Sequence, residues 1–166
     1  MTDVTIRPAV ETDAAAIAAI YAHYVRETTI TFEEDAVTPG DMGPRMAAVA
    51  AAGLPWLVVS RGPDVYGYAY ATPWRPRTAY RFSAETTVYL AHDAVGRGLG
   101  TRVYTDLLAR LTDLGLHVAL GGIALPNAAS VALHESCGFR KVAHLSEVGF
   151  KFGRWVDVGY WQRALA

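Results

Sequence analysis

The chain has 166 residues, of which 52% are hydrophobic and 19% are charged, a balance that is typical of a globular protein and excludes a disordered chain. Its formal net charge of −1 provides no basic field for nucleic acid, so we expect no nucleic-acid partner. The length predicts a single domain over residues 1–166.

Cysteine and histidine usage argues against a metal site. Cys137 is the single cysteine, which excludes an intrachain disulfide and a cysteine metal cluster, and the five histidines lack a close metal-ligand spacing.

The N-terminal stretch has neither a basic start nor an apolar core, and there is no uncharged apolar run of about 18 residues. We therefore expect no metal, no membrane partner and a cytoplasmic location.

The chain begins with the pattern of one strand and two helices. Residues 4–8 predict a short strand, and Thr12 or Asp13 can cap a helix over residues 14–27. A second helix is predicted for residues 38–52, which begin with Thr-Pro and are followed by glycine.

The β-branched stretch ETTITFEE connects these helices and favours a loop that can line a pocket. Phe32 and Glu33 are its candidate site residues. The alternative stays open, with Phe32 as a core anchor and Glu33 as a solvated charge.

The next segment predicts a hairpin followed by a cluster of arginines. Two hydrophobic runs flank Gly-Pro-Asp at residues 62–64, which is a strong hairpin signal. Arg75, Arg77 and Arg81 then stand among aromatic residues. Guanidinium groups at this density can bind a substrate carboxylate or another oxyanion, although a solvated loop is the alternative.

The chain is organised around residues 86–115, which read as strand, glycine-rich turn and helix. Thr86, Thr87, Val88, Tyr89 and Leu90 favour a strand, and apolar residues recur at helical spacing from Thr101 until Gly115. Between them lie Gly96, Arg97, Gly98 and Gly100. Glycines let the backbone approach a ligand, and a helix N-terminus offers unpaired N–H groups, so this turn predicts a pyrophosphate site.

Two common nucleotide motifs do not fit this turn. A P-loop requires Lys and then Ser or Thr after its last glycine, but Gly100 is followed by Thr101 and Arg102. A dinucleotide fingerprint requires a third glycine where Val103 stands.

The remaining segments complete an alternating pattern of strands and helices. Residues 117–123 predict a buried strand, and Asn127 can cap the helix that follows. His134 stands seven residues, or about two helical turns, after Asn127. The C-terminal residues alternate as two closing strands.

The turn resembles the acetyl-CoA loop of the GNAT superfamily of N-acetyltransferases, Arg/Gln-x-x-Gly-x-Gly/Ala. Gly98 and Gly100 match this pattern, while Val95 replaces the leading Arg/Gln. The segment NAASVALHESCGF resembles the next motif of the superfamily, with His134 in place of its Tyr. From about Thr28 onward the chain is similar to phosphinothricin N-acetyltransferases and to relatives acting on methionine sulfone and methionine sulfoximine.

The resemblance implies an α/β (α+β) fold with a central mixed, mostly antiparallel sheet that splays at the cofactor site and is flanked by helices. It also implies acetyl-CoA as co-substrate and a homodimer. The implied acetyl-CoA contacts are Val88, Tyr89, Leu90, Gly96, Arg97, Gly98, Leu99, Gly100, Thr101, Asn127 and Ser136. The implied substrate contacts are Arg75, Arg77, Arg81, Glu85, Thr86 and Thr87, and Phe32 of the loop is a further candidate contact.

Aromatic and apolar side chains of the C-terminal strands predict the subunit contact. They are Phe150, Phe152, Trp155, Val158, Tyr160 and Trp161.

Acetyl transfer requires a base, an oxyanion donor and a leaving thiolate. Glu85 is the candidate base, although it can instead anchor the substrate ammonium or pair with an arginine. A strand N–H near Leu90 is the candidate oxyanion donor. His134 is the candidate acid, with holding the pantetheine arm or a structural role as alternatives, and Cys137 has no evident histidine partner for an acyl-enzyme.

We therefore expect direct transfer, in a ternary complex, to the α-amine of a small amino-acid analogue. The alternatives are a non-catalytic acyl-CoA-binding regulator and an acetyltransferase for a protein or another small amine.

Overall fold

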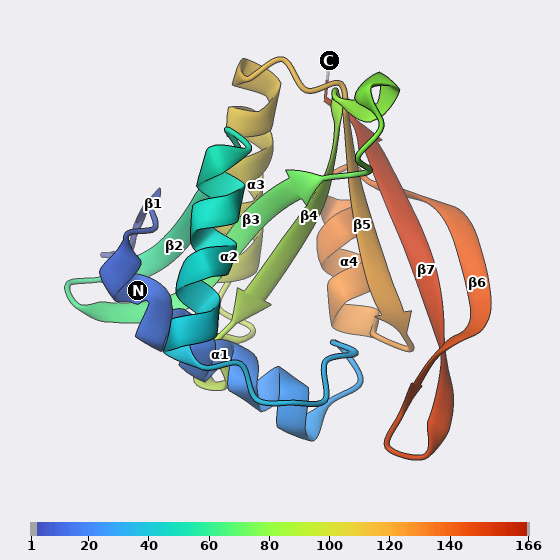
Figure 1. The fold of residues 1–166 in the computed structure, drawn as a ribbon, viewed down its shortest axis with the longest axis horizontal. Coiled ribbons are helices and arrows are strands. Elements are labelled where there is room, and N and C mark those ends of the chain that lie inside the picture. Colours follow the sequence, from blue (N-terminus) through green and yellow to red (C-terminus); the bar gives the residue numbers. More distant parts are fainter. Residues whose placement is uncertain (1–2, 166) are drawn as a thin grey trace.

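The computed structural model describes residues 3–165, which form one seven-stranded sheet with helices on both faces (Figure 1). The strands lie in the order β1-β2-β3-β4-β5-β7-β6. Their bounds are Thr5–Pro8 for β1, Trp56–Arg61 for β2, Asp64–Pro73 for β3, Ser83–Leu90 for β4, Val118–Leu125 for β5, Arg140–Lys151 for β6 and Arg154–Ala164 for β7.

Strand directions confirm the expected mixed, mostly antiparallel sheet. Five of the neighbouring pairs are antiparallel, and only β4 and β5 are parallel. This parallel pairing covers Ser83 to Glu85 only, whereas β4 stays paired with β3 as far as Leu90 and β5 stays paired with β7 as far as Leu125. The sheet therefore splays beyond Glu85, as predicted.

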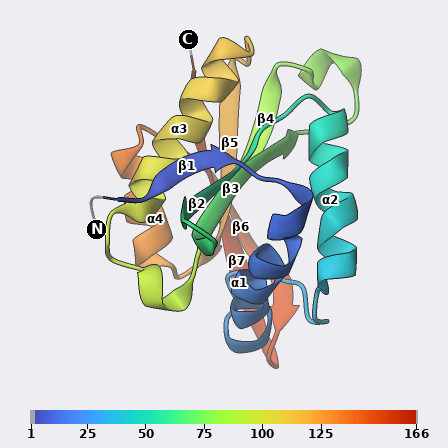
Figure 2. The same ribbon diagram turned by 90° about the vertical axis from the view of Figure 1, so that its left-hand side faces the viewer.

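Two pairs of helices cover opposite faces of the sheet (Figure 2). On one face lie α1 (Ala14–Glu27) and α2 (Pro39–Ala51), and on the other lie α3 (Leu99–Asp113) and α4 (Ala128–Ser136). Each face has its own cluster of buried apolar side chains. None of the helices within residues 3–165 has the length and apolar character needed to cross a membrane.

The helix α3 is held by a row of buried side chains at helical spacing. Val103, Leu107 and Leu111 have no exposed surface, and each buried side chain of this kind contributes about 1.5–3 kcal/mol. The helix begins at Leu99, two residues before the predicted start, because Gly98 adopts φ 73° as its N-cap and Leu99 is already buried.

Of the predicted helix caps, Asn127 is confirmed and Asp13 is wrong, and Thr38 caps α2 without having been predicted to do so. Thr38 accepts the backbone N–H of Asp41, and Asn127 accepts that of Ser130. Asp13 occupies the N-cap position of α1, but its carboxylate instead accepts hydrogen bonds from Arg7 and from the backbone of Val10. An arginine with two donors outcompetes the helix N–H groups for this carboxylate.

Candidate active site

The splay leaves backbone groups of β4 facing open space. Trp74 donates its N–H to Ser83, and Ala91 donates its N–H to Tyr66, so the odd-numbered residues of β4 pair with β3. In an antiparallel ladder the residues between them point the other way, toward β5. Within the described strands β5 pairs with β4 only as far as Glu85, and the amides at positions 88 and 90 therefore face the gap.

A buried hydroxyl marks the point where the two strands separate. Thr86 Oγ1 lies 2.6 Å from Tyr104 Oη and 3.1 Å from the carbonyl oxygen of Leu120. A hydroxyl has one proton, so Thr86 donates to Leu120 and accepts from Tyr104. Thr86, a predicted substrate contact, thus points into the α3 side of the core, where its hydroxyl is bonded to Tyr104 and to the Leu120 carbonyl.

The glycine-rich turn lies at the start of α3, beside the open end of the gap. Gly96 and Gly98 have φ of 79° and 73°, and no atom lies within 4 Å of a Cβ built at either position. The first intrahelical bond of α3 runs from Arg102 N to Gly98 O, and among the described residues no side chain caps this helix. The N–H groups of Leu99, Gly100 and Thr101 are thus available to an anion.

Gly100 lies where α3 meets β4 and α4. A Cβ there would meet Leu90 Cδ1 at 3.4 Å and Leu133 Cδ2 at 3.5 Å. These are ordinary contact distances, so a side chain as small as that of alanine would fit at this position. Arg97 and Thr101 are exposed at this end of the helix.

The predicted cofactor residues of β4 divide between the two faces of the sheet. Val88 and Leu90 contact the α3 side, while Tyr89 packs edge-on against Tyr21 at 5.2 Å between ring centroids. The carbonyl of Leu90 accepts a 2.6 Å hydrogen bond from Tyr24, which ties α1 to the end of the strand.

Helix α4 places Asn127 and His134 on the other side of the gap. His134 is buried and lies against β5, because a Cβ at Gly121 would meet His134 Nε2 at 2.5 Å. Its Nδ1 lies 2.7 Å from the carbonyl oxygen of Ser130. A carbonyl only accepts, so Nδ1 carries the proton and Nε2 of the neutral ring carries the lone pair.

Burial lowers the pKa of His134, and the hydrogen bond to the Ser130 carbonyl offsets part of this shift. The neutral ring therefore predominates at neutral pH, with no proton on Nε2 to donate. This geometry argues against a role as general acid and fits the structural role, because the ring is buried and its Nε2 lies against Gly121.

Glu85 is the last residue of the parallel pairing and lies on the α1–α2 face of β4. Its Oε1 would lie 3.4 Å from a Cβ at Gly122, beside the ring of Tyr160. Burial raises the pKa of the Glu85 carboxyl, and the charge of Arg75 partly opposes this shift. A carboxyl of this kind is suited to accept a proton near neutral pH.

The three predicted arginines do not converge on one point. Arg75 is the arginine whose charge acts on Glu85, and its guanidinium lies 5.0 Å from the ring of Trp74. Arg81 donates to the carbonyl of Thr78 and stacks 4.5 Å from a neighbouring ring. Arg77 is exposed.

A pocket of about 280 Å³ lies on the same face as Glu85. Thr72 pairs with Glu85 across the sheet, Tyr70 pairs with Thr87, and Trp56 pairs with Tyr70. Trp56 Nε1 is buried and has no hydrogen-bond partner among the described residues. The pocket is lined by Arg45, Ala48, Val49, Trp56, Tyr70, Thr72 and Pro73.

The loop between α1 and α2 crosses to the C-terminal hairpin and closes the splayed end of the sheet. The Phe32 ring lies on Gly149, where a Cβ would meet its Cζ at 2.3 Å, and Phe32 remains 40% exposed. The buried Lys151 donates to the carbonyl of Thr31 at 2.8 Å. Glu33 forms a salt bridge with Arg45 at 2.7 Å, so it is not simply a solvated charge.

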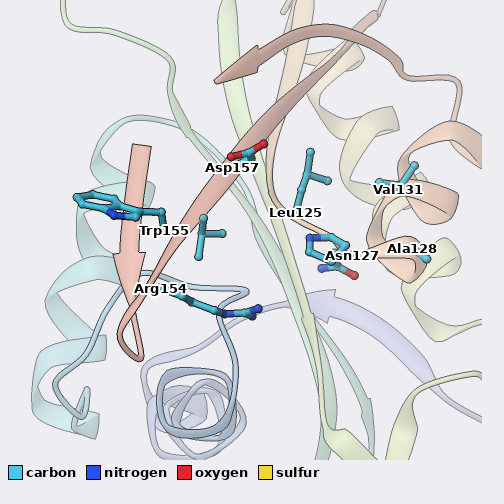
Figure 3. Close-up of a pocket in the computed structure, with 9 residues that line it drawn as sticks. Leu125, Asn127, Ala128, Val131, Arg154, Trp155 and Asp157 are labelled. Carbon is cyan, nitrogen blue, oxygen red and sulfur yellow. The ribbon is translucent and has the colours of Figure 1, made fainter. Parts of the chain in front are cut away.

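Figure 3 shows a second hollow, of about 540 Å³, beside the first turn of α4. Asn127, Ala128 and Val131 lie on one side of it, and Arg154 and Asp157 of β7 lie on the other. Ser136 lies outside this hollow, and its hydroxyl donates to the carbonyl of Leu133.

Sequence reasoning did not find Tyr160 or Gly122 as neighbours of Glu85, nor Trp56 as a lining residue of the pocket on the same face. Tyr160 and Gly122 come together through the β5–β7 register, which no local pattern encodes. The adjacent glycines 121 and 122 within a strand were the available signal, because glycine there often marks a close approach.

The chain matches known acetyltransferases over nearly its whole length. Residues 6–159 match the acetyltransferase (GNAT) domain family. A phosphinothricin N-acetyltransferase of Alcaligenes faecalis is 45% identical over 162 residues, which cover 97% of this chain and 82% of that protein. An L-methionine sulfoximine/L-methionine sulfone acetyltransferase of Pseudomonas paraeruginosa is 40% identical, with 95% and 92% covered.

The same relationship holds in three dimensions. The crystal structure of a GNAT superfamily phosphinothricin acetyltransferase from Sinorhizobium meliloti, in complex with acetyl-CoA, aligns with a TM-score of 0.94 at 36% identity. The alignment covers 98% of this chain and 89% of that one. With its splayed sheet, glycine turn and family match, the chain belongs to the GNAT acetyltransferases.

Proposed function

We propose that this protein transfers the acetyl group of acetyl-CoA to the α-amine of a small amino-acid analogue such as phosphinothricin, methionine sulfone or methionine sulfoximine. The observation that carries the proposal is the position of Glu85 at the apex of the splay, beside backbone amides that face open space. Relatives named for these substrates support the choice of substrate class.

The residues around the gap fit acetyl-CoA as co-substrate. The first N–H groups of α3 and the open positions of Gly96 and Gly98 suit a pyrophosphate. Asn127 at the start of α4 and Val88 and Leu90 of β4 are placed to contact the pantetheine arm. The thioester supplies the activated acetyl group. The protein positions the two substrates and supplies the base and the backbone N–H dipoles.

Glu85 acts as the general base in this proposal. A substrate ammonium is unreactive until it loses a proton, and a carboxyl with a raised pKa accepts that proton more readily. The amine then attacks the thioester carbonyl, and the N–H of Leu90 is the proposed donor to the oxyanion. His134 does not act as the acid in this proposal, because its buried ring carries no proton on Nε2.

The α1–α2 face provides candidate recognition for a second polar group on the substrate. Arg75 is the cation whose charge lowers the pKa of the Glu85 carboxyl and so opposes part of the effect of burial. The unpaired N–H of Trp56 lies in the neighbouring pocket, and leaving such a buried donor unpaired typically costs about 1–3 kcal/mol. An S=O or P–O oxygen would satisfy it.

The test is a thiol-release assay with acetyl-CoA against phosphinothricin, methionine sulfone, methionine sulfoximine and ordinary amino acids. We expect rapid release with at least one of the three analogues. Acetyl-CoA binding without release on any amine would indicate a regulator, and release only with peptides would indicate a protein acetyltransferase.

Three further expectations complete the proposal. Residues 1–166 act as one acetyltransferase domain, the protein works in the cytoplasm where acetyl-CoA is available, and two copies associate. The exposed apolar side chains at the C-terminal hairpin support the last of these.

A further inference from the structure

Three polar side chains outside this site form a hydrogen-bonded row across β6 and β7. Lys141 Nζ lies 2.9 Å from His144 Nδ1, and His144 Nε2 lies 2.7 Å from Asp157 Oδ2. This is the arrangement of a nucleophile, a base and a group that orients the base.

A bulge in β6 creates the first contact. Residues three apart in a regular strand point to opposite faces of a sheet. The register of β6 with β7 shifts just after Lys141, where Val142 is an extra residue, and Lys141 and His144 therefore share a face. On this face the ammonium of Lys141 lies 5.4 Å from the ring of Trp161.

A second irregularity fixes the other end of the row. Between Leu145 and Gly149 the register shifts again, and Glu147 adopts φ 54°, which is uncommon for a residue with a side chain. This conformation directs the Glu147 N–H onto the second oxygen of Asp157 at 2.8 Å. The carboxylate is thus held by two donors, and it holds the His144 ring in turn.

The hydrogen-bond partners of His144 show which of its two ring nitrogens carries the proton. The ammonium of Lys141 has only donors and the carboxylate of Asp157 has only acceptors. Nδ1 of His144 is therefore the acceptor and Nε2 carries the proton. The lone pair of a neutral imidazole is directed at a lysine amine in a protein that, by its proposed function, works with acetyl-CoA.

We propose that Lys141 is a self-acetylation site activated by His144 and Asp157. The ammonium passes one proton to His144 Nδ1, and the free amine attacks the thioester carbonyl of acetyl-CoA taken from solution. The C–N bond forms, the C–S bond breaks, and coenzyme A leaves as the thiolate and takes up a proton. The amide nitrogen loses a second proton to water, so each event yields one acetyl-lysine, one free thiol and one released proton.

The composition of the chain makes this proposal easy to test. Lys151 is the only other lysine, and it is 1% exposed and bonded to the carbonyl of Thr31. Lys141 is exposed at the start of β6. Acetylation of lysine can therefore be assigned to one residue by peptide mass spectrometry.

The experiment incubates the full chain with acetyl-CoA at neutral pH and measures acetyl-Lys141 over time, with Nα-acetyl-lysine amide in the same tube as an ordinary amine. We expect Lys141 to be acetylated about tenfold faster than the free amine, or more, because a positioned base accelerates the reaction. His144→Gln and Asp157→Asn should each lower the rate at Lys141 toward that of the free amine. Equal rates for Lys141 and the free amine, or no effect of His144→Gln in a variant with unchanged Tm, would overturn the proposal.

A second donor separates this proposal from the proposed function. Acetyl phosphate acylates amines without a coenzyme A site, so a His144-dependent rate with acetyl phosphate supports an activated Lys141 even if no small amine is a substrate. If acetyl phosphate gives no His144-dependent rate, the lysine is not activated, whatever the outcome of the thiol-release assay.

Discussion

At the scale of single residues, Glu85 is the group whose removal tests the chemistry most directly. Glu85→Gln keeps the shape of the side chain but cannot accept a proton, so we expect kcat to fall by roughly 10²-fold or more. The loss should diminish at high pH, where the substrate amine is already free. Measurement of kcat against pH for both forms tests this, and near-normal activity at neutral pH would give Glu85 a structural role.

The same substitution has a predicted effect on stability. Burial raises the pKa of Glu85 in the folded state, so the folded protein binds this proton more tightly than the unfolded chain does. Stability therefore falls as the pH rises from the ordinary carboxyl pKa through the raised value. Glu85→Gln removes this loss, and we expect its Tm to exceed that of the wild type at neutral pH.

A pH series separates this effect from a general gain in packing. The advantage of Glu85→Gln should disappear below both pKa values, where Glu85 is protonated in the folded and unfolded states. A Tm difference that stays constant across the series would contradict the assignment.

Arg75 and Arg77 form a matched pair for substrate recognition. Both side chains are exposed, and Arg75 is the one whose charge acts on the Glu85 carboxyl. We expect Arg75→Ala to raise KM for phosphinothricin or methionine sulfone about tenfold, equivalent to about 1.4 kcal/mol, with little change in KM for acetyl-CoA. The expected change for Arg77→Ala is smaller. Equal and small effects of both changes would indicate a solvated loop.

Among these residues, those in local motifs were predictable and those joined by long-range pairing were not. Glu85, Gly98 and Asn127 follow from their places at a strand start, in a turn and at a helix cap. The role of Thr86 required the structure, because its buried bonds to Tyr104 and Leu120 depend on α3 and β5. The neutral form of His134 could not be predicted from the sequence either, because it depends on the burial of the ring and on its hydrogen bond to the Ser130 carbonyl.

At the scale of elements, the glycine turn and α3 form the proposed acetyl-CoA site, and Gly98→Val tests it. Gly98 has φ 73° and open space around it, so Gly98→Val is strained in its backbone and also covers the N-terminus of α3. We expect the dissociation constant for acetyl-CoA to rise at least tenfold, or about 1.4 kcal/mol, measured by calorimetry.

Gly53 provides the control, because it has φ 70° and equally open space but lies after α2. Gly53→Val should cost similar stability and leave acetyl-CoA affinity unchanged. Unchanged affinity in a folded Gly98→Val variant would remove the turn from the site.

The order of helices and strands followed from periodicity and caps, whereas their arrangement did not. The hydrophobic runs around Gly-Pro-Asp predicted the β2–β3 hairpin, whose turn is Gly62 and Pro63, because Asp64 already pairs with Arg61. The splay after Glu85 was expected only through the family resemblance, because a strand with apolar residues on both faces does not identify its partner. The contact of Phe32 with Gly149 joins segments far apart in the chain and has no local signal.

At the scale of the whole molecule, the C-terminal hairpin exposes the apolar surface expected of a subunit contact. Phe150, Phe152 and Trp155 are 54%, 58% and 62% exposed. Trp161 was wrongly included in this surface, since it is 2% exposed and donates to Glu135 Oε1. It turns inward because Gly159 leaves room for its ring, where a Cβ would meet Trp161 Cζ3 at 2.4 Å.

We therefore expect a homodimer at micromolar concentration, held in part by Trp155 and Phe150, whose rings lie 4.8 Å apart. Trp155→Glu places a charge in this surface, and burying an unpaired charge is costly, so this variant should be monomeric by light scattering. Leu114→Glu is the control, because Leu114 is similarly exposed at 55% but lies at the end of α3. It should stay dimeric. A wild-type monomer, or a monomer from both variants, would show that the hairpin is not the contact.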